Sequence, residues 1–496
     1  MMQWTGDPYV DVGLATILAF RNKEDPAQLT DDDLRAMAEW IAENYARNPL
    51  KSFLTVAFTS NAWFAQPSFT PEKREERGKV HLFAWQQASS GTERCVFTGL
   101  PSAAVPLSDK LAPGRAARAQ IPLTQGDEDI NFYPNGDSGL AISGQALLCL
   151  QAFPLGCAKL SGRLLAVHAS QPAVTLAFAR EFLAINRKNI ALAQQAGETK
   201  LPETRYGIGT LLVDTLMKII AESRYLADDS APFSIIAYHL TNGQTPEIAI
   251  YHLPLGVTGF LRLARTPRYS AAWGRIAQAA LPRQAEDDGA AGNRKRLAKA
   301  KGATAKPTIQ RNPLYEDLLS LPEEAPRFLR RYLLRDALHQ AKSLTATQSD
   351  AAVPAAGSAS WDLTELFLKE VMSMDKTRIE HIRALGDRLA DYVAAENDRR
   401  FFRAFYSEQN YALLRNALLK ANTNAVRRGK PPLITFDQFI EVFEEGEDIA
   451  YKDWKLARDL VLIRMIERLA AWLSDNADAL PEPSADGSSL PEDEQT

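Results

Sequence analysis

The chain has 496 residues, enough for roughly two to four domains. Its net charge of -4 gives no overall sign of a polyanionic partner, so any basic surface must be local. Three cysteines, Cys95, Cys149 and Cys157, are too few for a disulfide framework and favour a reducing, cytoplasmic setting. The N-terminus lacks a signal-peptide pattern and no apolar run reaches about 20 residues, so we expect a soluble protein with no membrane partner.

The first 130 residues predict a helix, a charged surface segment and short strands. Thr30 followed by three aspartates is a typical helix start, because the hydroxyl caps the helix and the acids favour its dipole. Residues 71–79 are interpreted as a charged surface helix or loop. The strands are predicted at residues 53–58, 80–85 and 95–100, the first ending in a polar turn at Asn61.

Residues 131–168 form the most distinctive stretch of the chain. A loop rich in turn-forming residues opens it. The apolar segment from Ala146 to Phe153 lacks polar alternation and predicts a buried helix that Pro154 ends. Lys159 follows between two glycines, and residues 164–168 resume as a strand. The arrangement fits a ligand-binding loop, or simply a core helix between two turns, and the residues leave both open.

A β-hairpin is predicted further along the chain. Helices are expected at residues 173–195 and 210–226. Residues 233–240 and 247–253 then flank Asn242-Gly243, which is typical of two strands joined by a short loop. His239 and His252 lie in these strands without cysteine or acidic companions at metal spacing, so we interpret them as packed or surface residues.

Positive charge gathers between residues 262 and 311, where twelve Lys or Arg meet three acids. The centre of this region has almost no large apolar residue, so we expect a mobile basic loop. Such a patch could neutralise phosphates with little sequence information, or it could be a solvated loop without a specific partner. The phosphate-binding candidates here are Arg262, Arg265, Arg268, Arg275, Arg294, Lys295, Arg296, Lys299 and Lys301.

Residues 361–475 are helical in pattern almost throughout and carry two apolar stripes, which predicts a helix bundle. Between Arg378 and Lys430, eleven Lys or Arg face six acids, so we expect one basic side, with Arg427 and Arg428 as further phosphate-binding candidates. Residues 475–496 carry seven acids and no base, which is typical of a disordered acidic tail.

The predicted fold class is α+β: a mixed α/β N-terminal domain followed by an all-α helical bundle. The predicted segments are a mixed domain at 1–260, a basic and partly flexible region at 261–342, a linker at 343–360, the bundle at 361–475 and the acidic tail at 476–496.

A search for catalytic motifs finds no phosphate-binding glycine loop with lysine, no His-Glu-x-x-His and no Gly-x-Ser-x-Gly. Without a nucleophile and base, we expect a binding protein and no enzyme. The competing class is a nuclease whose metal carboxylates are scattered along the chain, with Asp7, Asp11 and Asp137 as candidates.

Four segments carry a resemblance to a known family: RNPLKSFLTVAFTSNAWF, FYPNGDSGLAISG, LQAFPLGCAK and the strand LLAVH. Together they resemble the CXXC-CXXC family of CRISPR-associated proteins, the large subunit of the type I-B Cascade complex. The resemblance covers roughly residues 5 to 260, and the basic and helical regions agree with it only in character.

The resemblance implies an antiviral ribonucleoprotein in which this chain recognises the protospacer-adjacent motif in double-stranded DNA, starts strand separation for crRNA pairing and holds the displaced strand of the R-loop. It implies as partners the crRNA, the backbone, 5′-handle-binding and small subunits, and a helicase-nuclease or transposition adaptor. It also implies a bundle like the Cascade small subunit, which can be made separately from an internal start; Met372 and Met374 are the candidates.

One departure from the family concerns metal. The family name records two Cys-x-x-Cys pairs, but Cys95 is followed at the fourth position by Thr98, and Cys157 by Leu160. A structural zinc site normally has four ligands, so we predict no zinc and no other cofactor, and expect packing to hold these turns.

Motif readout needs polar side chains at a groove, because only base edges carry sequence. The candidates on loops beside the signature segments are Asn61, Asn131, Asn135 and Lys159. A third class of function is an interaction scaffold, in which tail and bundle recruit an effector and DNA contact is secondary.

Overall fold

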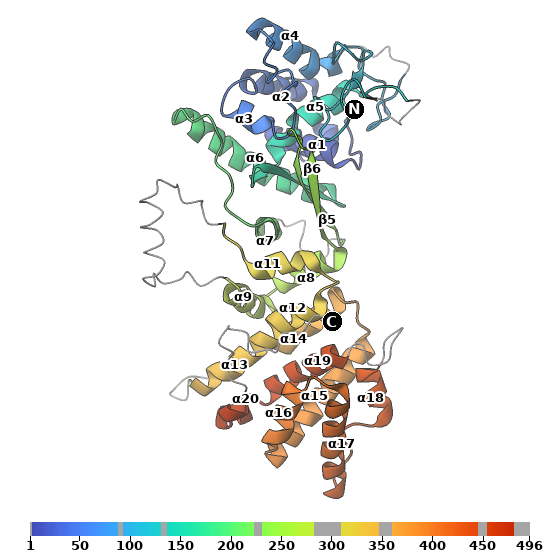
Figure 1. Cartoon of the computed structure of the whole chain (residues 1–496), viewed down its shortest axis with the longest axis vertical. Coiled ribbons are helices and arrows are strands. Elements are labelled where there is room, and N and C mark those ends of the chain that lie inside the picture. The colour runs from blue at the N-terminus through green and yellow to red at the C-terminus, as the bar shows by residue number, and fades with distance from the viewer. Residues whose placement is uncertain are drawn as a thin grey trace. The chain divides into compact units, whose positions relative to one another are not determined.

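A computed structural model of the chain describes residues 2–87, 93–129, 136–222, 231–281, 309–346, 360–444 and 454–480. It has the predicted α+β class: small antiparallel sheets lie in the N-terminal half, and the C-terminal region is helical (Figure 1). The chain divides into two compact units. The first unit runs to Thr258 and includes residues 309–311, and the second contains residues 259–281 and the described residues from Asn312 onward.

The first unit begins with four helices, and Thr30 caps the second of them. These helices are α1 (Pro8–Arg21), α2 (Asp31–Asn44), α3 (Leu50–Leu54) and α4 (Pro71–Leu82). The Thr30 hydroxyl accepts from the Asp33 N–H, and the Asp33 carboxylate accepts from the Thr30 N–H, which forms a capping box. The start of α2 at this point confirms the sequence prediction.

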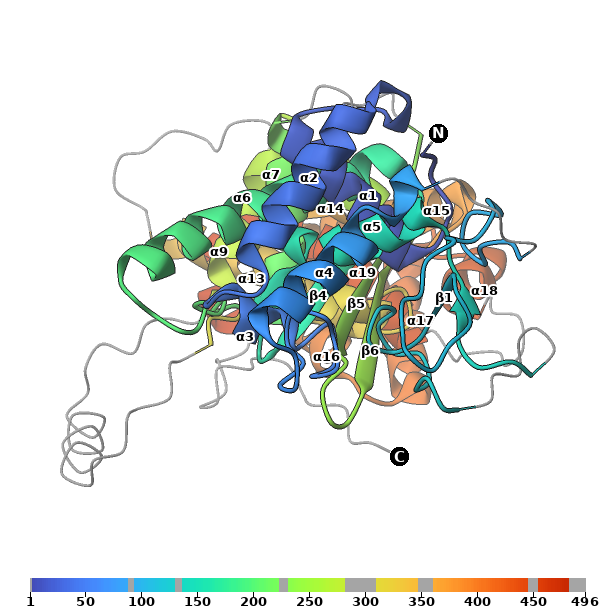
Figure 2. The same ribbon diagram turned by 90° about the horizontal axis from the view of Figure 1, so that it is seen from above.

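The core of the first unit is built around α1. Its neighbours are α5 (Gly144–Ala152), the 3-10 turn Phe153–Gly156 and α6 (Pro172–Gln195). Figures 1 and 2 show α1 close to α5 and α6. A Cβ at Gly13 of α1 would lie 1.9 Å from the Cys149 carbonyl oxygen, and one at Gly156 would lie 2.0 Å from Thr16 Oγ1. Only glycine, which has no Cβ, allows these two close approaches.

A four-stranded antiparallel sheet packs beside these helices in the order β3-β4-β5-β6. Its strands are β3 (Ala158–Leu160), β4 (Arg163–Ala169), β5 (Ile235–Thr241) and β6 (Glu247–Leu253). Ile235 pairs with Leu253 and Thr241 with Glu247, so the predicted hairpin is confirmed. A second sheet joins β1 (Arg115–Ala116) to β2 (Leu140–Ala141), and α7 (Ile208–Glu222) completes the unit.

Three predicted strands are wrong. Residues 53–58 end α3 and continue in tight turns, with Phe58 N–H donating to the Leu54 carbonyl. Residues 80–85 finish α4 and enter a 3-10 turn. Residues 95–100 close a loop in which Cys95 N–H donates to the Leu100 carbonyl. Short apolar runs occur in any buried segment, so periodicity cannot separate a strand from a buried turn of helix.

The second unit is helical throughout its described part. Its helices are α8 (Leu255–Ala264, which begins in the first unit), α9 (Ser270–Ala279), α11 (Pro313–Asp317), α12 (Ala325–Phe328), α13 (Arg335–Ala346), α14 (Ser360–Glu370), α15 (Lys376–Glu396), α16 (Arg399–Ser407), α17 (Tyr411–Arg427), α18 (Phe436–Phe443), α19 (Trp454–Arg468) and α20 (Ala470–Asp475). A π-helical segment, Leu329–Leu334, joins α12 to α13.

Aromatic packing fixes the start of this unit. Phe260 of α8 meets Trp273 and Phe367 edge to face, and Phe328 stacks on Phe367 with ring centres 5.1 Å apart. Helix α15 packs along α19, as the predicted bundle requires. Most of the predicted linker and nearly all of the predicted acidic tail lie outside the described residues. No helix in the described ranges is long and apolar enough to cross a bilayer.

Candidate nucleic-acid interface

The signature segments of the first unit meet at Gln151, whose side chain is 1 % exposed. Its Oε1 accepts from the Trp63 indole N–H at 3.0 Å, and its carbonyl accepts from the Tyr45 hydroxyl at 2.5 Å. Asn242 joins the hairpin to the same group, because its backbone N–H donates to the Val56 carbonyl at 2.7 Å. The signature residues at these points therefore hold the core together, and their polar atoms are used inside it.

The three cysteines of the chain, of which Cys157 lies in a signature segment, do not fit a zinc ion. All three are buried, and burial raises the pKa of the Cys149 and Cys157 thiols, which keeps them protonated. The Cys157 thiol donates to the Phe153 carbonyl at 3.2 Å. Within the described ranges, no three His, Cys, Asp or Glu side chains gather as metal ligands. The turn after α5 is held by this hydrogen bond and by packing.

Asn61 is exposed at the mouth of a cavity of about 350 Å³. Buried His81 lies in its lining, with Nδ1 2.8 Å from the Arg77 carbonyl. Burial lowers the pKa of His81 to about 4, so the imidazole is neutral at pH 7. Gln120 also lines the cavity and donates to the Leu107 carbonyl at 3.1 Å. Neutral hydrogen-bonding groups therefore lie inside the cavity, and the Asn61 amide is exposed to solvent at its edge.

Two of the three cations that line this cavity are ion-paired, and the third, Arg118, donates hydrogen bonds to Asn242 and Gly243. Arg77 forms an ion pair with Asp109, and Lys110 lies 2.7 Å from Glu128. The rim is therefore close to neutral, and the cavity suits an uncharged polar group such as a base edge better than a phosphate.

Lys159, the second readout candidate that the structure describes, has a structural role. It lies on β3 with its side chain 13 % exposed, and its ammonium group is 3.4 Å from the Leu201 carbonyl and 3.6 Å from Glu203. These contacts tie the segment after α6 to the sheet, so Lys159 is poorly placed for a base. Asn131 and Asn135 lie outside the described residues.

Two of the four arginines predicted to bind phosphate between residues 262 and 275 are ion-paired within the second unit. Arg268 lies 3.4 Å from Asp362 and over the Tyr269 ring, and Arg275 lies 3.3 Å from Asp336. Arg262 and Arg265 are not free either. The remaining candidates of the basic loop, Arg294, Lys295, Arg296, Lys299 and Lys301, lie outside the described residues.

The bundle presents cations that the sequence prediction had not selected. We define the α16–α17 cation set as Arg400, Arg415, Lys420 and Arg427, which are exposed and have no ion pair or hydrogen bond within the described ranges. Arg427 was predicted, whereas its neighbour Arg428 pairs with Glu396, as does Lys430 at 2.7 Å. The described part of the fold therefore does not neutralise the positive charge of these four residues.

The outer side of α17 combines these cations with exposed apolar residues. Its buried residues are Leu414, Leu418, Ala421 and Ala425, spaced three or four apart. On the opposite side, Leu419 and Val426 are 51 % and 52 % exposed, and each pair Leu419/Val426 and Lys420/Arg427 is seven residues apart, so each lies along one row. Phe436, the first residue of α18, is 77 % exposed. The phase of the buried residues is the signal that could have identified this face from sequence.

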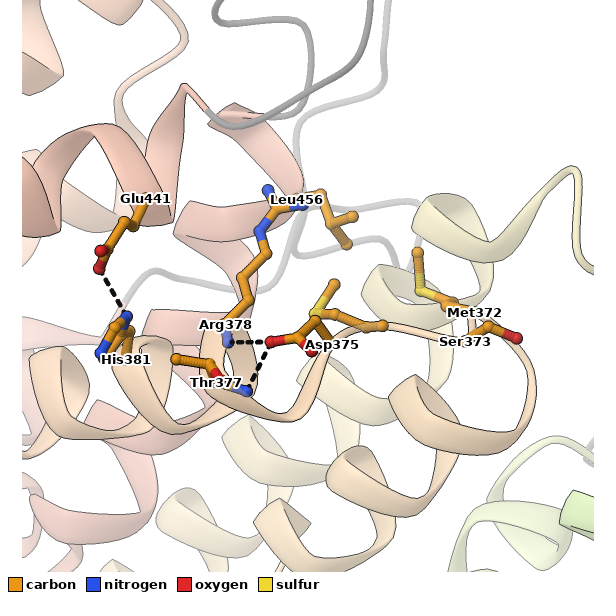
Figure 3. Close-up of a pocket in the computed structure, with 9 residues that line it drawn as sticks. Met372, Ser373, Asp375, Thr377, Arg378, His381, Glu441 and Leu456 are labelled. Carbon is orange, nitrogen blue, oxygen red and sulfur yellow. Dashed lines mark hydrogen bonds and ion pairs between the residues drawn. The ribbon is translucent and has the colours of Figure 1, made fainter.

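A second cavity, of about 460 Å³, lies at the turn between α14 and α15 (Figure 3). Figure 3 shows His381 facing Glu441, with Nδ1 2.6 Å from the carboxylate. Asp375 caps α15 by accepting from the N–H groups of Thr377 and Arg378. These polar groups bond to one another, and the pair of His381 and Glu441 holds α18 against α15. Met372, a candidate internal start, lines this cavity, so a product beginning there would lack α14, which packs on α19.

The carboxylates considered for a nuclease have other partners. Asp11 is buried, and although burial raises its pKa, hydrogen bonds from His168 and from Thr5 and Gly6 lower it further than burial raises it. Asp7 caps α1, and Asp137 lies 3.1 Å from Arg115. These contacts hold the start of α1 and the loop before β2.

No family model matches this chain, and a search of the curated proteins finds no match. The functional conclusion is therefore drawn from the motifs and from the geometry described above.

Proposed function

We propose that this chain is the large subunit of a type I-B CRISPR Cascade ribonucleoprotein in the cytoplasm. In this role it recognises the protospacer-adjacent motif in double-stranded DNA, promotes strand separation for crRNA pairing and holds the displaced strand. It acts by binding, without catalysis of its own. Its partners are the crRNA, the target duplex, the other Cascade subunits and a helicase-nuclease or transposition adaptor.

The observation that carries this proposal is the α16–α17 cation set beside exposed apolar side chains. Single-stranded nucleic acid is bound by cations that follow the backbone and by aromatic rings on which bases stack. Arg415, Lys420 and Arg427 supply charge along one helix, and Phe436 supplies an exposed ring. Within the proposal, this surface holds the displaced strand.

Motif recognition is assigned to the first unit. Asn61 is exposed at the cavity mouth, and an asparagine amide can both donate to and accept from a base edge. The paired cations of the rim favour a contact with bases over one with phosphates. The signature segments position this loop through the hydrogen bond between Trp63 and Gln151.

The test is binding of a crRNA-loaded complex, with and without this chain, to duplexes that differ only in the few base pairs beside the target. We expect motif-dependent binding only when the chain is present, and loss of that dependence in Asn61→Ala. The matched control is Asn44→Ala, which removes an amide on α2 that donates to the Trp40 carbonyl one turn earlier. Equal binding with and without the chain would refute the proposal.

A second candidate function is an interaction scaffold, favoured by the apolar part of the same surface. Leu419, Val426 and Phe436 are exposed apolar side chains, which a surface that binds only phosphates does not need. In this case Leu419→Ser with Val426→Ser would abolish effector recruitment and leave DNA affinity unchanged. A parallel loss of DNA affinity would instead support the Cascade proposal.

A further inference from the structure

Segment 481–496 has the charge of a short polyanion. It carries five acids and no Lys or Arg, and it follows the last described residues of the second unit. The acids are Glu482, Asp486, Glu492, Asp493 and Glu494. In a chain with an unneutralised basic surface, such a segment is a potential intramolecular partner for it.

The chain just before this segment already lies against the start of α16. The Asp478 carboxylate is 3.1 Å from Arg399 and 3.0 Å from Arg403. The Trp472 indole donates to Asn397 Oδ1 at 3.0 Å. Segment 481–496 therefore begins beside the basic first turn of α16. Asp478, which shortly precedes the segment, already pairs with arginines there.

Two of the unpaired cations, Arg400 and Arg427, lie at the same end of the bundle. Arg400 is three residues before Arg403, so the two are neighbours on the helix surface. Glu396, at the end of α15, pairs with Arg428 and Lys430, which brings the end of α17 and its Arg427 to the start of α16. The acidic segment thus leaves the bundle where cations of the α16–α17 set are exposed.

The segment is long enough to cover the whole set. Sixteen residues in extended conformation reach about 50 Å, whereas the 17 residues of α17 span about 25 Å. Its one large apolar residue, Leu490, could also cover part of the exposed row of Leu419 and Val426.

We propose that segment 481–496 docks on the α16–α17 cation set when no nucleic acid is bound, with its carboxylates in place of phosphates. A tethered segment acts at an effective concentration on the order of millimolar, so individually weak ion pairs suffice. Nucleic acid must then displace the segment, which favours long strands over short ones. The competition rests on the proposed function, whereas docking of the segment does not.

The test uses the full chain and a fluorescein-labelled peptide of residues 481–496 at about 50 mM salt. One protein is the native chain, and the other is a neutral-tail chain with E482Q, D486N, E492Q, D493N and E494Q. We expect the neutral-tail chain to bind the peptide and the native chain to bind it at least about tenfold more weakly, because its own segment occupies the surface. Adding R400Q, R415Q, K420Q and R427Q to the neutral-tail chain should abolish peptide binding.

Equal peptide binding by the two chains, or none by the neutral-tail chain, would overturn the inference. Circular dichroism of each variant verifies folding, which these exposed positions should not affect. A parallel titration with single-stranded DNA separates the two proposals. Peptide binding without DNA binding would refute the proposed nucleic-acid function and keep the docked segment, and DNA binding without peptide binding would do the reverse.

Discussion

The two units treat their polar side chains differently. In the first unit, Gln151, Asn242 and Arg115 are buried and hydrogen-bonded to segments far along the chain. In the second unit, buried charge is concentrated at Asp459 and its arginines, while Arg400, Arg415, Lys420 and Arg427 remain exposed without partners within the described ranges. Polar residues that are hydrogen-bonded inside the fold contribute to its stability, whereas exposed polar residues without partners are available for binding.

The buried charge of the second unit should give the largest effect on stability. Asp459 lies 2.8 Å from both Arg330 and Arg458, and the Asp459 and Arg458 side chains are each 4 % exposed. Asp459→Ala removes the carboxylate that faces the buried Arg458 guanidinium, so we expect the free energy of unfolding to fall by about 3 to 5 kcal/mol. Denaturant unfolding measures this change.

The control for this prediction is Asp391→Ala, which removes one of the two carboxylates paired with the exposed Arg468. Exposed pairs contribute less than about 1 kcal/mol, so this variant should be close to the native chain. Similar losses for Asp459→Ala and Asp391→Ala would contradict the distinction between buried and exposed charge.

The buried histidine of the first unit predicts a pH effect. Burial lowers the His81 pKa from 6.5 to about 4, so the unfolded chain binds a proton over this range that the folded chain rejects. The contribution of neutral His81 to the free energy of unfolding is therefore fully present above pH 6.5 and is lost as the pH falls towards 4. The loss should be on the order of 3 kcal/mol, which is the pKa difference converted to free energy.

Thermal unfolding across this pH range is the measurement, with His81→Gln beside His252→Gln, an exposed histidine of β6. His81→Gln should flatten the pH dependence relative to the native chain, and His252→Gln should leave it unchanged. An unaltered pH dependence in His81→Gln would show that the imidazole is not held neutral by burial.

The link between signature segments predicts a smaller effect. Gln151→Leu leaves the buried Trp63 N–H without its acceptor, which should cost about 1 to 2 kcal/mol of unfolding free energy. Trp63→Phe removes the same hydrogen bond from the other side. If the bond couples the segments, the two substitutions together should cost less than their sum; strict additivity would contradict this coupling.

Sequence patterns identified what local chemistry determines. The cap at Thr30 and the hairpin at Asn242 were both predicted, because each depends on residues a few positions apart. The strand predicted at 53–58 was wrong, since burial on all sides produces an apolar run in either backbone conformation.

The candidate site was less accessible to sequence. Lys159 was predicted to contact bases and Arg268 to contact phosphates, but their partners Glu203 and Asp362 are distant in sequence, and only the fold brings them together. The α16–α17 cation set depends on which side of α17 is buried. The spacing of Leu414, Leu418 and Ala421 contains that information, but a count of charges does not use it.

The most direct test of the nucleic-acid surface is the salt dependence of single-stranded DNA affinity, measured in the neutral-tail chain. One variant carries R400Q, R415Q, K420Q and R427Q. The control carries R35Q, K79Q, R180Q and K218Q, which remove the same charge from cations of the first unit that are paired with acids and lie outside the Asn61 cavity.

The account predicts that the slope of log affinity against log salt decreases in magnitude by about 0.7 for each α16–α17 cation removed, or about 3 in all. The control should keep the slope of the neutral-tail chain, because its cations are already neutralised by carboxylates. Equal slopes for both variants would contradict the assignment of nucleic-acid binding to α16 and α17.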